Sequence, residues 1–168
     1  MYTQAIHDLA IDLGRMLAKS VGLASKLFKG WSCHLRINKY NFTPQTVGST
    51  ALRMHTDSGF LTLLQDDENV SGLEFVDKSG ASVSIDPWPG TLLVNLGDIA
   101  KCKEASIRVS IASFFLGPKE AAVEAPPELV DSENPRQFVP FTYEDYRKLR
   151  LSINLHVGEA LQFVRSHS

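Results

Sequence analysis

The sequence is short of cysteine, of excess positive charge and of long apolar runs, and each shortage excludes a class of protein. Its 168 residues include two cysteines, Cys33 and Cys102, so a disulfide framework is not expected and a reducing, cytoplasmic location is predicted. Lys and Arg number 17 against 19 Asp and Glu, which argues against a nucleic-acid-binding protein built on phosphate contacts. No apolar run approaches the ~20 residues of a membrane-spanning helix, and the N-terminus lacks the basic segment of a secretory signal. The sequence therefore predicts neither a nucleic-acid partner nor a membrane partner.

The remaining composition is that of one packed domain. The hydrophobic class makes up 43% of the residues and the charged class 21%, which supplies enough apolar material for a core and argues against disorder. The length also fits a single domain on the usual scale of about 100–200 residues.

Residues 2–21 have the periodicity of an amphipathic helix, and Gly22 is a typical residue for its end. Apolar side chains recur at the spacing that places them on one face, which we expect to be buried. The expected buried residues are Ile6, Leu9, Ala10, Leu13, Met16 and Leu17. The polar face mixes acidic and basic residues, which favours packing on a core over lying on a membrane surface.

Between Trp31 and Leu116 the pattern changes to short β-type runs separated by residues that favour turns. Many short strands at this spacing predict a sandwich or a barrel. The expected strands are Leu35–Asn41, Leu52–Thr56, Phe60–Gln65, Leu73–Val76, Ser82–Ile85, Leu92–Leu96 and Ile107–Leu116.

The last part of the chain begins with a proline-rich stretch, residues 117–141, that is typical of an irregular connector. A helix is predicted after it, with Thr142 as the N-terminal cap and acidic residues in the first turn. We expect this helix to end near Leu155 and the tail Val164–Ser168 to fray.

One of the five histidines, His55, lies two residues before an acid, Asp57. Because side chains i and i+2 of a strand point to the same face, this imidazole and this carboxylate can converge on one point. Such a pair supplies two of the three ligands of the 2-His-1-carboxylate triad that holds non-haem iron(II). A three-residue pattern also arises by chance, so a hydrogen-bonded surface pair is the alternative.

Two further pairs have the same i, i+2 spacing. Arg108 and Ser110 lie in the most apolar run, where an inward guanidinium is costly unless an anion meets it. A guanidinium beside a hydroxyl is well suited to a carboxylate ligand, although Arg108 can instead face solvent or pair with an internal acid. Asn38 and Tyr40 can bond an oxyanion or, equally, satisfy backbone groups.

Taken in order, five segments resemble the iron(II)- and 2-oxoglutarate-dependent dioxygenase superfamily of plants. Within it they look most like the branch that oxidises auxin, indole-3-acetic acid, in auxin catabolism. The segments are RINKYNFTPQTVGST, HTDSGFLTLLQDDENVSGLEF, DPWPGTLLVNLGD, RVSIASFFLGP and FVPFTYEDYRKLR. The resemblance covers nearly the whole chain.

The resemblance implies a mainly β fold with flanking helices, the double-stranded β-helix or jelly roll. Residues 1–30 would form a helix before the barrel, residues 31–117 the dioxygenase barrel, and residues 118–168 a connector and a C-terminal helix.

The resemblance also implies the cofactor, iron(II), and the co-substrate, 2-oxoglutarate. The implied metal ligands are His55 and Asp57. The residues implied to bind 2-oxoglutarate are Arg108, Ser110, Asn38 and Tyr40. The other partners would be O2 and a small carboxylate substrate such as indole-3-acetic acid, and the reaction would release succinate and CO2.

The sequence departs from the family at the second iron histidine. The family places it roughly ten residues before the arginine that matches Arg108, but no histidine lies between Asp57 and Arg108. We expect an internal deletion of about fifteen residues near 100–102, because the segment that would carry this ligand is missing. Asp98 and His156 are poor replacements, since Asp98 belongs to a turn and His156 follows the barrel.

The chain also begins inside the helix before the barrel, so the N-terminal region of the family is expected to be absent and the barrel incomplete. Two hypotheses stay open. The first is a dioxygenase that oxidises a small carboxylate. The second is a truncated, catalytically impaired relative that lacks the third iron ligand and acts as a non-catalytic binding protein or has no function.

Overall fold

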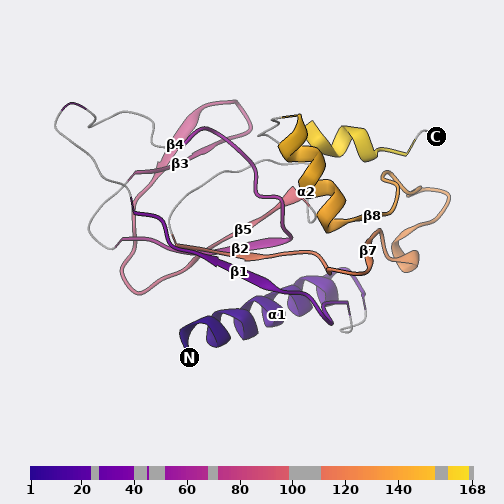
Figure 1. Cartoon of the computed structure of the whole chain (residues 1–168), viewed down its shortest axis with the longest axis horizontal. Coiled ribbons are helices and arrows are strands. Elements are labelled where there is room, and N and C mark those ends of the chain that lie inside the picture. The colour runs from indigo at the N-terminus through magenta and orange to yellow at the C-terminus, as the bar shows by residue number, and fades with distance from the viewer. Residues whose placement is uncertain are drawn as a thin grey trace.

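A four-stranded antiparallel sheet forms the centre of the molecule (Figure 1). The computed structural model of the chain describes residues 1–23, 27–39, 45, 52–67, 72–98, 111–153 and 159–166. The elements are α1 (Tyr2–Ser20), β1 (Cys33–Arg36), β2 (Leu61–Gln65), β3 (Leu73–Val76), β4 (Ser82–Ile85), β5 (Leu93–Leu96), β6 (Ile111–Phe115), β7 (Ala122–Val123), the 3-10 helix η2 (Pro127–Leu129), β8 (Phe141–Thr142), α2 (Tyr143–Ser152) and the 3-10 helix η3 (Glu159–Val164). In the part of the chain that is described, no helix is long and apolar enough to cross a membrane.

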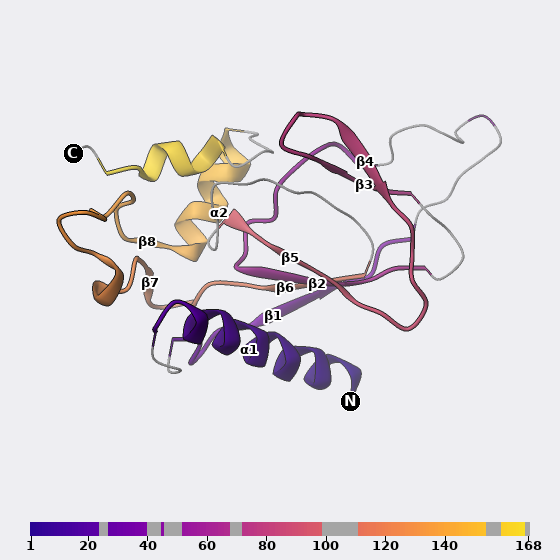
Figure 2. The ribbon, with the colours of Figure 1, turned by 180° about the vertical axis from the view of Figure 1, so that it is seen from behind.

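The central sheet has the strand order β1-β6-β2-β5. Leu63, in the middle of β2, lies opposite Ser113 of β6 on one side and Val94 of β5 on the other. Strands β3 and β4 form a separate antiparallel hairpin. The hairpin and α1 lie on opposite sides of the central sheet (Figures 1 and 2), so the expectation of a mainly β fold with flanking helices is confirmed.

Helix α1 forms where the periodicity predicts it, but its buried face is different from the predicted one. The buried residues recur every fourth position and are Ile6, Ala10, Gly14 and Ala18. Three residues predicted to be buried are exposed: Leu9, Met16 and Leu17.

The physical reason for this correction is close packing, because small residues allow the helix to approach the core. A Cβ added at Gly14 would lie 3.0 Å from the ring of Phe28.

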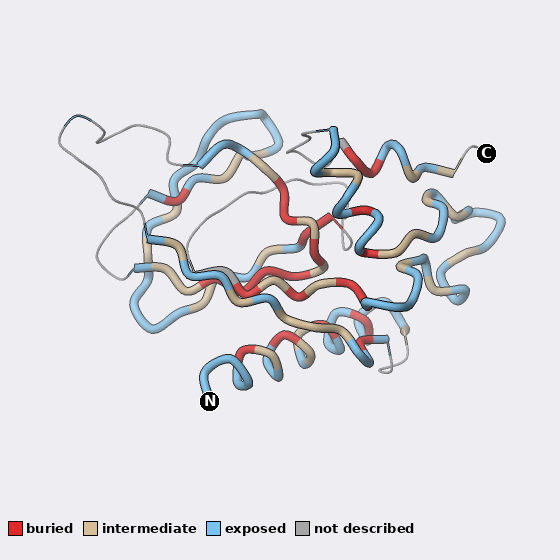
Figure 3. Tube along the Cα trace, in the orientation of Figure 1, coloured by how far each residue is buried: buried red, intermediate tan, exposed pale blue. Residues whose placement is uncertain are grey.

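Aromatic rings fill the space between α1 and the central sheet. The ring of Phe28 lies 5.1 Å from those of Trp31 and Phe60 and 5.6 Å from that of Phe115, measured between centroids. These rings join Leu61 and the small residues of α1 in one core cluster. Figure 3 shows the buried residues along the central strands and on the side of α1 that faces them.

The predicted strands are correct where a partner strand is present. β3 and β4 have the predicted bounds, whereas the first predicted strand is shifted and forms β1. Residues Leu52–Thr56, predicted to be a strand, are not one. A β-type run becomes a strand only where a neighbouring strand pairs with its backbone groups, and no residue in the described ranges forms such a ladder with it.

The C-terminal part is more ordered than its composition predicts. The connector contains η2 and β7, and β7 pairs with β8. The tail Val164–Ser168 is predicted to fray, but its described part is paired: Arg165 forms a β-bridge with Phe138, and the Ser166 N–H donates to the Gln137 carbonyl at 2.9 Å. Residues 167–168 lie outside the described residues.

The cap of α2 is confirmed, because the Thr142 hydroxyl accepts from the Asp145 N–H at 3.1 Å. The helix ends at Ser152, earlier than predicted.

Gly97, just after β5, packs directly against the backbone of the turn that follows Asp57. A Cβ at Gly97 would lie 2.9 Å from the Asp57 carbonyl oxygen and 2.8 Å from the carbonyl carbon of Gly59. We therefore expect Gly97→Ala to lower the free energy of unfolding by about 1–3 kcal/mol, because backbone atoms have to move.

Urea denaturation measures this change. The control Ser84→Ala, at an exposed position of β4, should shift the free energy of unfolding by no more than about 0.5 kcal/mol. Equal free energies of unfolding in the two variants would show that the close approach of Gly97 to the backbone of Asp57 and Gly59 does not contribute to stability.

Candidate metal centre

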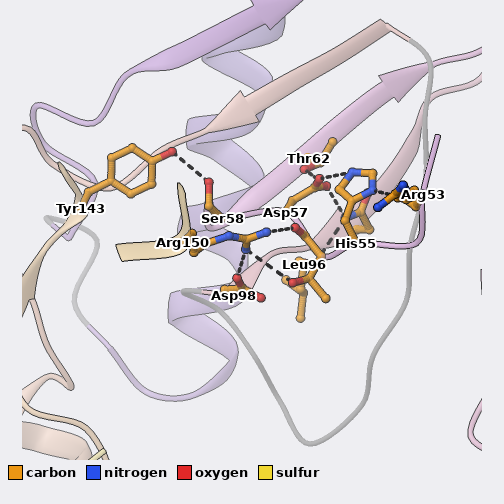
Figure 4. A network of polar contacts seen from close by, with 11 residues as sticks. Arg53, His55, Asp57, Ser58, Thr62, Leu96, Asp98, Tyr143 and Arg150 are labelled. Carbon is orange, nitrogen blue, oxygen red and sulfur yellow. Dashed lines mark hydrogen bonds and ion pairs between the residues drawn. The ribbon is translucent and has the colours of Figure 1, made fainter. Parts of the chain in front are cut away.

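The ring of His55 is held in one orientation by a backbone carbonyl. Its Nδ1 lies 2.9 Å from the carbonyl oxygen of Arg53 (Figure 4). A carbonyl oxygen only accepts hydrogen bonds, so Nδ1 carries a proton, and Nε2 is the nitrogen through which this ring can bind a metal ion. This Nε2 faces the carboxylate of Asp57, with 3.7 Å between Nε2 and Oδ1.

The Asp57 carboxylate is buried and is fixed through its other oxygen. Its Oδ2 accepts from the Thr62 hydroxyl at 2.6 Å and from the Asn95 amide at 3.1 Å. Thr62 of β2 and Asn95 of β5 lie directly opposite each other in the sheet, so they share a face. Two neighbouring strands therefore hold Oδ2 and leave Oδ1 turned toward His55.

The turn that carries Asp57 is bound to the end of β5 by two backbone hydrogen bonds. The Gly97 N–H donates to the Phe60 carbonyl and the Asp98 N–H to the Asp57 carbonyl, each at 2.8 Å. These bonds hold the predicted metal ligand at the end of β5, where its side chain meets the sheet face that carries Thr62 and Asn95.

The spacing of His55 and Asp57 fits two ligands of one metal ion. Atoms that each lie about 2.1 Å from an ion are separated by about 3.0 Å at a right angle and by at most about 4.2 Å. The observed 3.7 Å lies in this range and is too long for a hydrogen bond. Ligating histidines usually donate their other ring N–H to a carbonyl or carboxylate, as His55 does here.

A third protein ligand does not join the pair among the described residues, which contain no group of three His, Cys, Asp or Glu able to hold a metal ion. The carboxylate of Asp98 is instead the partner of Arg150, with which it forms an ion pair. The Tyr146 hydroxyl also donates to Asp98 Oδ2, at 2.8 Å. Burial and the charge of Asp98 raise the pKa of Tyr146, so this phenol stays a donor.

The predicted co-substrate residues fall largely outside the described residues. This holds for Arg108, Ser110 and Tyr40, as it does for His156. Asn38 is described; it is half-buried and follows the end of β1.

The sheet register separates Asn38 from the metal pair. β1 ends at Arg36, opposite Ala112, which in turn lies opposite Leu64 near the end of β2. Asp57 precedes the beginning of β2. The structure therefore does not bring Asn38 to the pair, and its role at the co-substrate stays a prediction.

A cavity of about 330 Å³ opens at a different place from the His55–Asp57 pair. It lies between the hairpin and the central sheet and is lined by Leu64, Leu73, Ile85, Trp88 and Leu93 among others. Its lining does not include either member of the pair.

Sequence reasoning missed the residues that hold the pair in place. Thr62 is the one polar residue in the buried run Leu61–Leu64, which is a signal that a polar partner is near. Tyr143, Tyr146 and Arg150 are spaced to share one face of α2, on which both tyrosines are buried and Arg150 is half-buried, and this spacing was the available signal.

Comparison with known proteins identifies the family to which this chain belongs. Residues 31–116 match the family model described as the 2OG-Fe(II) oxygenase superfamily. This chain is a member of the 2OG-Fe(II) oxygenase superfamily. Iron(II) and 2-oxoglutarate are the cofactor and co-substrate of that superfamily, and the resemblance found in the sequence is confirmed.

Two curated relatives of this oxygenase chain come from rice. The "2-oxoglutarate-dependent dioxygenase DAO" of Oryza sativa subsp. indica and that of subsp. japonica are each 46% identical to it, over 95% of this chain and 59% of the relative. The chain therefore spans about three fifths of the length of these relatives.

Solved structures support the same family and the double-stranded β-helix fold. The crystal structure of the rice dioxygenase for auxin oxidation matches with a TM-score of 0.90 and 42% identity, over 98% of this chain and 62% of that one. Dioxygenase for auxin oxidation 1 of Arabidopsis thaliana, in a binary complex with 2-oxoglutarate, matches with a TM-score of 0.71 and 52% identity, over 80% of this chain and 57% of that one. The predicted jelly-roll class is confirmed.

The alignment with the rice relatives is longer than the part of the oxygenase chain that it covers. It spans 176 positions, whereas 95% of this chain is about 160 residues, so the relatives contribute roughly sixteen more. The size of this difference is close to that of the predicted internal deletion, whose position near residues 100–102 stays a prediction.

The hydroxyl of Thr62 can be removed without a large change of volume by Thr62→Val. We expect the Mn(II) dissociation constant, measured with 2-oxoglutarate and without oxygen, to rise about 10–100-fold, because Asp57 loses its shortest hydrogen bond.

Thr91→Val is the matched control, since the Thr91 hydroxyl donates to the Trp88 carbonyl. Equal Mn(II) affinities in the two variants would contradict a role of Thr62 in orienting the carboxylate.

Proposed function

We propose that this chain binds iron(II) through His55 and Asp57 and, with 2-oxoglutarate and O2, oxidises a small carboxylate such as indole-3-acetic acid. The observation that carries the proposal is that Nε2 of His55 faces Oδ1 of a buried carboxylate whose other oxygen is held by Thr62, with 3.7 Å between Nε2 and Oδ1. The similarity to the dioxygenases for auxin oxidation supports the class of substrate. The cytoplasmic location stays a prediction.

Bound iron(II) would supply the oxidising chemistry, in which one oxygen atom of O2 enters succinate as 2-oxoglutarate loses CO2 and the other enters the substrate as a hydroxyl group. The residues of the chain would position the reactants. His55 offers a neutral nitrogen ligand and Asp57 a negative charge that partly neutralises the ion. The guanidinium of Arg108, together with Ser110, would hold the distal carboxylate of 2-oxoglutarate. Asn38 and Tyr40 would line the same pocket.

A second candidate function is metal and ligand binding without turnover. It is favoured by one observation on the sequence, which contains no histidine between Asp57 and Arg108. Loss of a residue that only supports a metal ligand typically costs about 10–100-fold in affinity or activity, and loss of a ligand itself should cost more. A site with two protein ligands can therefore bind a metal ion while its turnover is strongly reduced.

Succinate release by the full chain distinguishes these candidates. With Fe(II), 2-oxoglutarate, O2 and indole-3-acetic acid, we expect succinate to form together with an oxidised indole product. His55→Ala should lower the rate at least tenfold because it removes a metal ligand. Succinate and the indole product are measured by chromatography.

His34→Ala is the matched control, because His34 is an exposed histidine on β1 and should leave the rate unchanged. A folded chain that binds the metal ion but releases no succinate would overturn the enzymatic proposal in favour of the second candidate.

A further inference from the structure

Helix α2 turns a polar face toward the segment that carries Asp57. The Tyr143 hydroxyl lies 3.1 Å from the Ser58 hydroxyl. One turn further along, the Tyr146 hydroxyl donates to Asp98, and Arg150 follows after one more turn. Figure 4 shows Arg150 between Asp98 and the backbone that leads into Asp57.

Arg150 makes two kinds of contact at this place. Its Nη2 donates to the carbonyl oxygen of Thr56 at 2.7 Å, and its Nη1 forms the ion pair with Asp98. These partners lie 94 and 52 residues away in the sequence. The Asp98 side chain is almost fully buried, so the ion pair is shielded from water.

The contacts of Arg150 fix two consecutive carbonyl groups. Arg150 binds the carbonyl of Thr56 directly. Asp98, held by Arg150, donates its own N–H to the carbonyl of Asp57 at 2.8 Å. The peptide between these two carbonyls leads to the Asp57 side chain, so its orientation sets the direction in which Oδ1 points.

We propose that Arg150 is a positioning residue for the His55–Asp57 pair, acting through the Thr56 carbonyl and through Asp98. The inference rests on the proposed function for its metal-binding consequence, whereas the fixed orientation of the backbone is a property of the metal-free chain. It makes the C-terminal helix part of the site, although the helix supplies no metal ligand.

The planar guanidinium is suited to this task because its nitrogens are held in a rigid fork. The guanidinium of Arg150 therefore binds the Thr56 carbonyl and the Asp98 carboxylate in a fixed relative position. α2 also has apolar anchors, since Tyr146 packs with Ala160 and Leu161 in a separate cluster and Leu149 lies against it. The packing of the helix and the polar contacts of Arg150 can therefore be perturbed separately.

The first test is amide hydrogen exchange in the full, metal-free chain. In Arg150→Met we expect the protection of the Asp98 amide to fall at least tenfold relative to that of Leu63, a buried residue of the central strand β2. The double variant Arg150→Met/Asp98→Asn removes the unpaired buried charge and should recover melting temperature. Its position-98 amide should nevertheless remain poorly protected, because the Thr56 carbonyl still lacks its partner.

Leu149→Ala is the matched control, since it weakens the packing of α2 and leaves the contacts of Arg150 in place. Its relative protection at Asp98 should equal that of the wild type. An Asp98 amide that stays as protected in Arg150→Met as in Leu149→Ala would overturn the proposal, as would a double variant whose protection recovers together with its melting temperature.

The second test is Mn(II) affinity with 2-oxoglutarate present and oxygen excluded. The dissociation constant should rise about 10–100-fold in Arg150→Met and in the double variant, and should stay unchanged in Leu149→Ala. A wild-type chain that binds no Mn(II) contradicts the proposed function, while the exchange experiment still decides the role of Arg150. Wild-type affinity in a folded Arg150→Met variant contradicts the positioning role.

Discussion

The buried carboxylate of Asp57 is the constraint around which the described structure is arranged. Burying a charged carboxylate is costly unless its oxygens find partners. Here hydrogen bonds from Thr62 of β2, five residues along the chain, and from Asn95 of β5, 38 residues away, hold Oδ2, while His55 faces Oδ1. The turn that carries the residue is bound to the end of β5, and Gly97 permits this approach because it has no side chain. One oxygen therefore accepts two hydrogen bonds, and the other is turned toward Nε2 of His55.

Local patterns predicted the parts of the molecule that depend on neighbours in the sequence. The bounds of β3 and β4 and the Thr142 cap of α2 follow from short-range geometry. His55 and Asp57 do face each other, but they do so outside the strand from which their convergence was predicted. Other features depend on what packs nearby, and these the sequence did not predict. Leu52–Thr56 has the composition of a strand but no partner among the described residues. The buried face of α1 follows its small residues, because the aromatic rings beneath it leave little room.

Long-range polar contacts were the hardest to predict, and several of them hold the candidate site in place. Arg150 reaches a backbone carbonyl 94 residues away, and no spacing rule connects the two. Asp98 occurs in a turn motif and was considered as a replacement ligand, but its carboxylate is bound to Arg150 and Tyr146. Membership of the oxygenase superfamily rests on the matched barrel segment, and the likeness to dioxygenases for auxin oxidation covers about three fifths of their length. Within the described ranges, the candidate site therefore consists of the His55–Asp57 pair and the residues that hold it in place.

The central claim is that His55 and Asp57 together bind one divalent metal ion. Electron paramagnetic resonance measures it directly, because Mn(II) bound to the protein loses the sharp signal of the free ion. In a titration of the full chain with 2-oxoglutarate present and oxygen excluded, we predict one bound Mn(II) per chain in the wild type. Binding should be lost in Asp57→Ala and retained in Asp86→Ala, a control at another carboxylate. A folded wild-type chain that leaves all Mn(II) free, or an Asp57→Ala variant that binds it as well as the wild type, would contradict the account.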